Sequence, residues 1–439
     1  MEHGTVPLVG VVEFLMLTAL CVSGVHIAIS MATVGLVFTL LFYGNLESVI
    51  TLVGLTVWSN MAHYSMSMIP LFVFMGELIR VSDLGKESYD CIYKWLSKLK
   101  GGLAITTVWT CAVFGSITGS TAGAIAAVGG IAVPEMKRHG YSKELRTGSI
   151  ASSGSLAHLI PPSIAAMFFG VMTSASVGKL FIAGIVPGII LSILFSVAVY
   201  IMVSLKPRIA PLTGESYSFR EKVVSLKKPM PLVVMFLVMF GGIYMGVFSP
   251  TEAAAMGCCL TMVMVVVMKR LTWQRFRDAM AETLRITAFI MLLISGAMLF
   301  SQSIALTGLP PFLGKMMTNL GPNPLLVIFA IVCVVVILGM FLDMFGLMVL
   351  TVPLFSPIVI QLGFDIIWYG VFTVVLLEIA LITPPVAAHI YIAQSLDDEA
   401  TTMDVARGIL PFLACEVILI VLLIFFPWIA LWLPAQMVR

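Results

Sequence analysis

Residues 159–163 read Leu-Ile-Pro-Pro-Ser, and residues 381–386 read Leu-Ile-Thr-Pro-Pro-Val. The two proline pairs lie 223 positions apart. Residues 184–187, Gly-Ile-Val-Pro, return as residues 408–411, Gly-Ile-Leu-Pro, at an offset of 224. Because such matches keep their order and an almost constant spacing, we infer that the chain contains two copies of one unit.

The composition around these repeats is that of a membrane protein. Of the 439 residues, 60% are hydrophobic and only 10% are charged, whereas about 25% of the residues in a soluble domain are charged. A spanning helix needs about 20 apolar residues, so the chain has room for many crossings and for no soluble domain. The net charge of +2 is spread over many loops and predicts no nucleic-acid partner.

Each copy predicts the same series of helices. In the first copy, 1–205, we expect helices at 8–23, 25–44, 47–63 and 67–82, a hairpin at 101–137, a broken helix at 144–172 and a last helix at 180–205. A cytoplasmic linker at 206–230 follows. We expect this linker and the polar stretch 80–100 to be loops. In the second copy, 231–439, we expect helices at 231–246, 250–268, 272–285 and 286–306, a hairpin at 323–361, a broken helix at 366–395 and a last helix at 406–426. The opening helices, within 8–82 and 231–306, form the predicted scaffold.

The long central segments decide the topology. Residues 101–137 and 323–361 are long enough for two crossings each, or for one re-entrant hairpin whose tip ends inside the membrane. Neither segment has a polar turn at which two full crossings could reverse, so we favour hairpins. A hairpin leaves five crossings in each copy, and an odd number inverts the second copy relative to the first.

The distribution of basic residues predicts the orientation. With the N-terminus outside, 21 of the 24 lysines and arginines lie on the cytoplasmic side, and only Lys179, Lys315 and Arg439 lie outside. The 21 fall in the segments 80–100, 137–146, 206–228 and 269–285 and at Arg407. We therefore expect an all-α polytopic membrane protein with two inverted repeats, each with five crossings and one re-entrant hairpin, and with both termini periplasmic.

Four stretches of irregular backbone are expected inside the membrane. Two are hairpin tips, at 115–121 and 339–346, and two are helix breaks, at 155–163 and 383–386. Unpaired backbone groups cost several kcal/mol each in hydrocarbon, so such backbone is tolerated only inside protein or at a cavity. Its freed carbonyls and hydroxyls can replace the water around a small cation, and the N-termini of half-helices attract an anion.

The candidate binding residues come from these stretches and their neighbours. Gly, Ser and Thr also occur where membrane helices pack closely, but two such clusters in register with two Pro-Pro breaks favour a site. Asp343, a carboxylate in the middle of an apolar segment, is expected to be functional. The candidates for cation binding are Gly115, Ser116, Thr118, Gly119, Pro161, Gly339, Asp343, Thr383 and Pro384. The candidates for substrate binding are Ser120, Thr121, Ser155, His158, Ser163, Glu378 and His389.

Enzymatic chemistry has little support in the sequence. The Gly-x-x-x-x-Gly-Lys-[Ser/Thr] motif is missing, so no ATP hydrolysis at a P-loop is expected. His-Glu-x-x-His and Cys-x-x-Cys are missing as well, and the seven cysteines are expected to pack as small apolar residues. We expect no enzyme activity and no cofactor.

The motifs together resemble one known family. They are the residues 115–138, 148–151, 159–163, 178–184, 249–253, 339–343 and 381–386. This pattern, over nearly the whole chain, resembles the large membrane subunit (the DctM-like M subunit) of tripartite ATP-independent periplasmic (TRAP) transporters. The resemblance implies an elevator-type ion-transporter fold and sodium-coupled import of a small organic acid across the bacterial inner membrane. It also implies two partners, a small four-helix membrane subunit and a soluble periplasmic substrate-binding protein.

Two other readings stay open at the level of the residues. One is a standalone ion-coupled carboxylate transporter of the same broad fold that needs no binding protein. Neighbouring genes for a four-helix membrane protein and a secreted binding protein would favour the TRAP transporter over this alternative. The other is a channel or a membrane-embedded enzyme. Paired hairpins that enter from opposite sides favour alternating access over an open pore.

Overall fold

The computed structural model describes residues 6–82, 84–309, 311–312, 324–340, 342, 344–383 and 387–437. Every regular element within these residues is a helix. Five of the described helices are long and apolar enough to cross a membrane, and the number rises to eight if each bent pair of helices is one span. The prediction of an all-α membrane protein is therefore confirmed.

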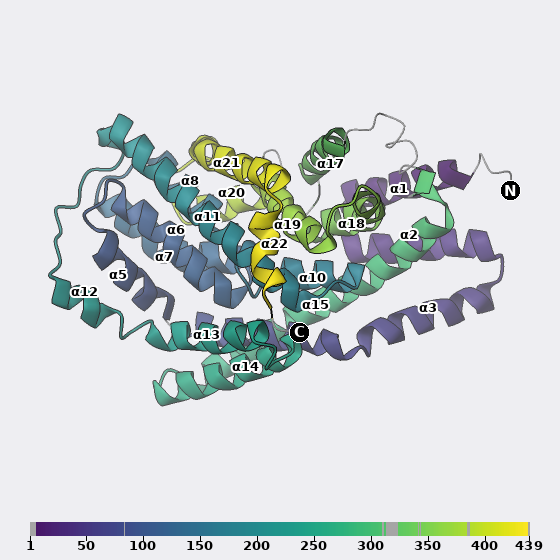
Figure 1. The fold of residues 1–439 in the computed structure, drawn as a ribbon, viewed down its shortest axis with the longest axis horizontal. Helices are drawn as coiled ribbons and strands as arrows, with labels where there is room; N and C mark the ends of the chain where they lie inside the picture. The colour runs from purple at the N-terminus through teal and green to yellow at the C-terminus, as the bar shows by residue number, and fades with distance from the viewer. Residues whose placement is uncertain are drawn as a thin grey trace.

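The first half of the chain forms helices close to the expected positions. They are α1 (Val6–Val22), α2 (Ile27–Tyr43), α3 (Leu46–Met61), the 3-10 turn η1 (Tyr64–Ser67), α4 (Met68–Arg80), α5 (Leu84–Leu96), α6 (Gly102–Thr118), α7 (Thr121–Arg138), α8 (Lys143–Ser153), α9 (Leu156–Leu159), α10 (Ile164–Thr173) and α11 (Val177–Leu205). Figure 1 shows α1 to α3 at one end of the long axis of the molecule and α5 to α8 at the other.

The second half follows the linker. Its described elements are η2 (Pro207–Ile209), α12 (Phe219–Ser225), α13 (Met230–Tyr244), α14 (Pro250–Val267), α15 (Trp273–Leu306), α17 (Pro324–Gly339), α18 (Met344–Gln361), α19 (Ile366–Ile382), α20 (Ala388–Ser395), α21 (Thr402–Phe425) and α22 (Trp428–Ala435). The scaffold helices pair across the two halves, α2 with α15 and α4 with α14.

α15 differs from the expected pair of helices at 272–285 and 286–306. It is one continuous helix of 34 residues, about 51 Å long at 1.5 Å per residue. Thr272 caps its start by accepting a hydrogen bond from the Arg275 N–H over 3.2 Å, and no glycine or proline interrupts it until Gly296. In the first half the chain does break, because His63 accepts from the Ser65 N–H and starts the turn η1 between α3 and α4.

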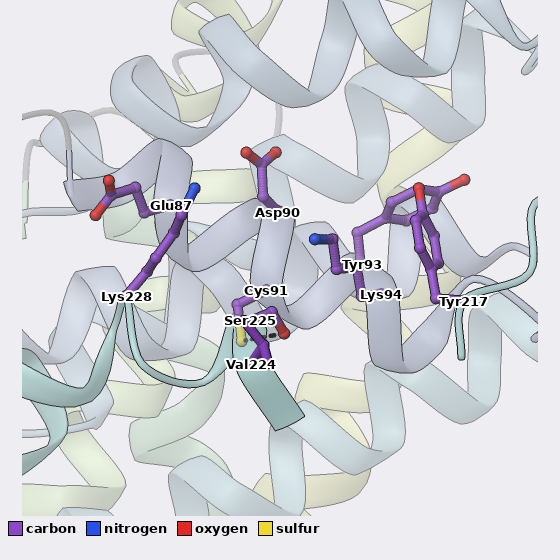
Figure 2. Close-up of a pocket in the computed structure, with 9 residues that line it drawn as sticks. All are labelled: Glu87, Asp90, Cys91, Tyr93, Lys94, Tyr217, Val224, Ser225 and Lys228. Atoms are coloured by element: carbon purple, nitrogen blue, oxygen red, sulfur yellow. Dashed lines mark hydrogen bonds between the residues drawn. The ribbon is translucent and has the colours of Figure 1, made fainter. Parts of the chain in front are cut away.

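The stretch 80–100 and the linker were expected to be loops, and each contains a helix. α5 buries one face, including Leu84 and Tyr89, while Lys86 and Asp90 are exposed. α12 of the linker packs against α5. Figure 2 shows residues of α5 and of the linker that line a pocket, with Ser225 hydrogen-bonded to Cys91. The pocket has a volume of about 200 Å³, and the Lys94 ammonium lies 5.6 Å from the centre of the Tyr217 ring. The linker is therefore folded against the first half.

A buried ion pair joins the two halves. Arg146, near the start of α8, donates two hydrogen bonds to Asp397, in the loop between α20 and α21, over 2.5 and 2.9 Å. A third bond, of 2.8 Å, joins Arg146 to Glu399. The Arg146 and Asp397 side chains are only 5% and 0% exposed. α8 also packs along α21, so the first broken helix is held by the last helices of the second half.

Candidate functional site

The first hairpin turns within two residues, Gly119 and Ser120, which connect α6 to α7. Gly119 has a φ of +62°, a left-handed conformation that favours glycine, and its N–H donates to the Gly115 carbonyl over 2.8 Å. Ser120 caps α7 by accepting a bond from the Gly123 N–H over 3.2 Å. The C-terminus of one helix and the N-terminus of the next therefore meet at the tip.

The first helix break lies between α9 and α10, and the stretch Lys143–Leu159, which holds α8 and α9, bends by 41° relative to α10. Ser163 caps α10 by accepting a hydrogen bond from the Ala166 N–H over 3.0 Å. Pro161 and Pro162 precede it, joined by a cis peptide bond. Since proline has no N–H to donate, backbone carbonyls one turn earlier are left without their helical partners. The break thus exposes carbonyl oxygens inside the protein.

The structure brings the first tip and the first break into contact. A Cβ placed on Gly115 would lie 2.5 Å from the Ala157 Cβ and 2.7 Å from its Cα, and one on Gly119 would lie 2.8 Å from the Pro162 carbonyl oxygen. These separations are shorter than van der Waals contact, so only glycine fits at either position. Gly115, Gly119 and Pro161, three of the predicted cation ligands, therefore belong to one neighbourhood.

The hydroxyl groups of this neighbourhood bond to their own helices. Ser116 donates to the Val113 carbonyl over 2.7 Å, and Thr118 donates to the Phe114 carbonyl over 3.2 Å. A hydroxyl that donates its proton still has lone pairs on oxygen that can coordinate a cation. The predicted substrate residue Thr121 is buried at the start of α7.

The end of α17 lies against the C-terminal part of α19, next to the second break. A Cβ on Gly339, at the end of α17, would lie 2.2 Å from the Ala380 Cβ in α19. Thr383, which ends α19, donates from its hydroxyl to the Ile379 carbonyl over 2.5 Å. Of the predicted cation ligands here, Asp343 and Pro384 lie outside the described residues, so the second neighbourhood is described only around Gly339 and Thr383.

Three of the predicted substrate residues meet in a second, fully buried cluster. His158 in α9 makes a hydrogen bond through Nδ1 to the carboxyl group of Glu378 in α19. His389 in α20 lies within electrostatic reach of His158. Ser155 lies at the edge of the cluster, where its hydroxyl donates to the Ser152 carbonyl over 2.7 Å.

The sequence reasoning missed the fourth ionisable member of this cluster. Glu416 in α21 has no exposed surface and lies beside Ser155, within electrostatic reach of Glu378. It is a carboxylate inside the apolar segment 406–426, so the rule that singled out Asp343 also applies to it. We name His158, Glu378, His389 and Glu416 the buried acid–histidine cluster.

One cavity among the described residues, of about 560 Å³, is lined by residues of α8, α11 and α21 and includes Lys206 and Arg407. Beside His158 there is space of only about 10 Å³. Searched over the described part of the chain, histidine, cysteine, aspartate and glutamate form no group of three that could hold a metal ion. None of the four side chains of the buried acid–histidine cluster is more than 7% exposed.

Comparison with known proteins places the chain among transporters. Residues 14–429 match the family model described as "Tripartite ATP-independent periplasmic transporter, DctM component". The chain is 32% identical over 378 residues to the C4-dicarboxylate TRAP transporter large permease protein DctM of Pseudomonas aeruginosa. The aligned region covers 85% of this chain and 86% of the relative. It is 30% identical to the ectoine/5-hydroxyectoine TRAP transporter large permease protein UehC of Ruegeria pomeroyi, over 96% of this chain and 97% of the relative.

A solved structure supports the fold. The YdaH transporter of Alcanivorax borkumensis matches with a TM-score of 0.53 at 14% identity, over 86% of this chain and 89% of that chain. At this identity the likeness concerns the fold alone. Together with the family match over nearly the whole chain, the comparisons show a multi-pass membrane transporter and not an enzyme. The chain belongs to the DctM family, the large permease component of tripartite ATP-independent periplasmic transporters.

Proposed function

We propose that this chain imports a small organic acid across the bacterial inner membrane by coupling its movement to sodium. The observation that carries the proposal is the contact between the oxygen-rich first tip and the first helix break, around Gly115 and Ala157. Hydroxyl and carbonyl oxygens are the ligands of hard cations, and this neighbourhood supplies them without a fixed charge. The missing P-loop motif favours an ion gradient over ATP as the energy source.

The sodium ligands of the proposal fall into two groups. Gly115, Ser116, Thr118, Gly119 and Pro161 serve the first tip and break. Gly339, Asp343, Thr383 and Pro384 serve the second. The two hairpins and two broken helices form a mobile domain that moves as an elevator against the paired scaffold helices. Its partners are a small four-helix membrane subunit and a periplasmic substrate-binding protein.

The substrate class rests on the relatives. Their names give C4-dicarboxylates, ectoine and sialic acid as transported solutes. These solutes share small size and a carboxylate group, which the N-termini of α7 and α10 at the tip and the break can attract without a basic side chain. We therefore propose a small carboxylate as the substrate.

We expect uptake to need a sodium gradient and to be indifferent to ATP. The test is uptake of a panel of radiolabelled carboxylates into proteoliposomes that contain both membrane subunits, with the binding protein added outside. Replacing external sodium with potassium should abolish uptake, whereas ATP should change nothing. Equal uptake in potassium, or a requirement for ATP, would refute the proposal.

Contacts between the basic segments support the proposed orientation. The Arg270 guanidinium donates to the Ser82 carbonyl over 2.9 Å, which joins the segments 269–285 and 80–100. The Ser142 N–H donates to the Ile209 carbonyl over 2.8 Å, which joins the segments 137–146 and 206–228. α12 lies on α5 and so joins the linker to the segment 80–100. Four basic segments thus gather at one face, as the positive-inside rule requires of a cytoplasmic surface.

Cysteine labelling tests this orientation. In a background without the natural cysteines, including the exposed Cys259, we expect Lys98→Cys and Lys143→Cys to react only with a reagent that reaches the cytoplasm. Lys179→Cys should react with a membrane-impermeant reagent added outside. All three lysines are exposed, so access and not burial decides the result. Labelling of positions 98 and 143 from opposite sides would rule out a hairpin between them.

A further inference from the structure

The buried acid–histidine cluster collects ionisable groups from four helices. His158 comes from α9, Glu378 from α19, His389 from α20 and Glu416 from α21, and α19 packs against each of the other three. Their exposed fractions are 7%, 2%, 1% and 0%. Such groups are rare in the interior of a membrane protein because the charged forms lose their hydration there, and they commonly mark proton or ion pathways.

Most polar atoms of the cluster have no hydrogen-bond partner among the described residues. Among the residues that the structure describes, the hydrogen bond between His158 Nδ1 and Glu378 Oε1 is the only one that joins two members of the cluster. Glu378 Oε2, both carboxyl oxygens of Glu416 and both ring nitrogens of His389 are buried without a hydrogen bond of good geometry. The Ser155 hydroxyl beside Glu416 donates to the Ser152 carbonyl instead, and the Ala151 backbone lies near His389. Unpaired groups of this kind are expensive, so they point to a ligand that the cluster can bind.

The described helices around the cluster supply no compensating cation. The groups that face it are the Ser155 hydroxyl, the Ala151 backbone, and the thiol of Cys415 beside Glu416. Arg146 is also on α8, but it lies nine residues before Ser155, about 13 Å along the helix axis, and is engaged by Asp397. Glu378 and Glu416 are therefore within electrostatic reach of each other, with no arginine or lysine among the groups that act on them.

The charges of the buried groups select the ligand. The small gap of about 10 Å³ beside His158 is otherwise lined by apolar residues, and Glu378, His389 and Glu416 do not line it. Two buried carboxylates close together cannot both remain ionised, because each unpaired charge costs several kcal/mol. A proton needs no cavity and removes one of these charges. It is therefore the ligand that fits the charges of the site.

We propose that Glu378 and Glu416, with His158, form an internal proton-binding site whose occupancy changes during transport. One proton binds a carboxyl oxygen of Glu416 or Glu378, and it leaves by the reverse step, so no other reactant is needed. His158, hydrogen-bonded to Glu378, relays the proton. The site is sealed in this conformation, so exchange with water requires α9 and α19 to α21 to shift. This inference rests on the proposed elevator function. The same movement would carry a proton together with sodium and the organic acid.

The first test measures the proton directly and needs no substrate. Infrared spectra of the purified protein in lipid at pH 7 should contain a carbonyl band of a protonated carboxylic acid that Glu416→Gln or Glu378→Gln removes. Both variants keep the shape of the side chain, and their melting temperatures check that they fold. The control Glu252→Gln, at an exposed position on α14, should leave the band unchanged. If neither variant at the cluster removes a protonated-carboxyl band, the two groups are ionised and the inference is wrong.

The second test measures coupling. Proteoliposomes of the complete transporter, loaded with a pH-sensitive dye, should acidify inside during sodium-driven uptake of succinate or whichever acid in the panel is transported. Glu416→Gln should lower the number of protons per acid by about one and flatten the pH profile of uptake. A proton carried by the acid itself would appear equally in both proteins. If Glu416→Gln keeps the wild-type number of protons per acid and normal sodium-driven uptake, the proton site is wrong and the proposed function stands. If uptake does not depend on sodium but the proton ratio of the wild type falls in Glu416→Gln as expected, the proposed sodium coupling is wrong and the proton site stands.

Discussion

Arg146→Met is expected to lower the free energy of unfolding by about 3–5 kcal/mol. The substitution leaves the Asp397 carboxylate, which is 0% exposed, without the two bonds of 2.5 and 2.9 Å that Arg146 donates to it. An uncompensated charge at such a site costs far more than the bonds themselves contribute, because water cannot reach it. The measurement is the denaturant or detergent midpoint of the purified protein, together with its melting temperature.

Two further variants show whether burial is the cause. Arg146→Met/Asp397→Leu removes both charges and should recover most of the lost stability, since replacing a buried pair with apolar residues is often nearly neutral. Arg285→Met removes an exposed pair with Glu282, in which the arginine side chain is 80% exposed, and should cost less than about 1 kcal/mol. Equal losses from Arg146→Met and Arg285→Met would contradict the role assigned to burial.

The second carboxylate bound by Arg146, that of Glu399, shows over which pH range the stabilisation acts. Hydrogen bonds from Arg146 and then Lys137 lower the pKa of Glu399 from 4.5 to about 2. Because the folded pKa is the lower one, the contribution of Glu399 to stability is complete above about pH 4.5 and is lost as the pH falls towards 2. At neutral pH the carboxylate stays ionised, so the effect of Arg146→Met should not change between pH 6 and pH 8.

Gly115→Val is expected to reduce sodium-driven uptake more than tenfold. The first added carbon would lie 2.5 Å from the Ala157 Cβ and 2.7 Å from its Cα, so α6 and the first break must separate. Overpacking of this kind costs about 1–3 kcal/mol, and it displaces the oxygens of Ser116 and Pro161 relative to each other. The substitution keeps the Gly115 carbonyl, so a loss of uptake reports on geometry and not on a deleted ligand. The measurement is uptake in proteoliposomes at several sodium concentrations.

Gly130→Val is the matched control. Gly130 is exposed on α7 of the same hairpin, and a Cβ there would meet nothing within 4 Å, so uptake should stay within about twofold of the wild type. Adding Ala157→Gly to Gly115→Val should not restore uptake, because the Ala157 Cα alone is too close to the new side chain. Near-normal uptake by Gly115→Val would show that the tip and the break need not touch.

Much of the fold was readable from local patterns. Apolar runs indicated most of the helices, and Pro161 and Pro162 marked a helix break because proline cannot continue a backbone hydrogen-bond ladder. The tip at Gly119 and Ser120 was readable for a similar reason, since glycine and serine end one helix and cap the next. These features depend on residues within one or two turns of each other, so the sequence alone determined them.

The tertiary structure decided which groups from distant parts of the chain share an environment. His158 and Glu378 are 220 positions apart, and Glu416 approaches Glu378 only because α21 packs against both α8 and α19. An apolar segment indicates that a helix is buried, but it does not say which neighbour each face meets. That choice follows from the packing of whole helices, so the sequence made Glu378 a candidate substrate residue but did not indicate its hydrogen bond to His158.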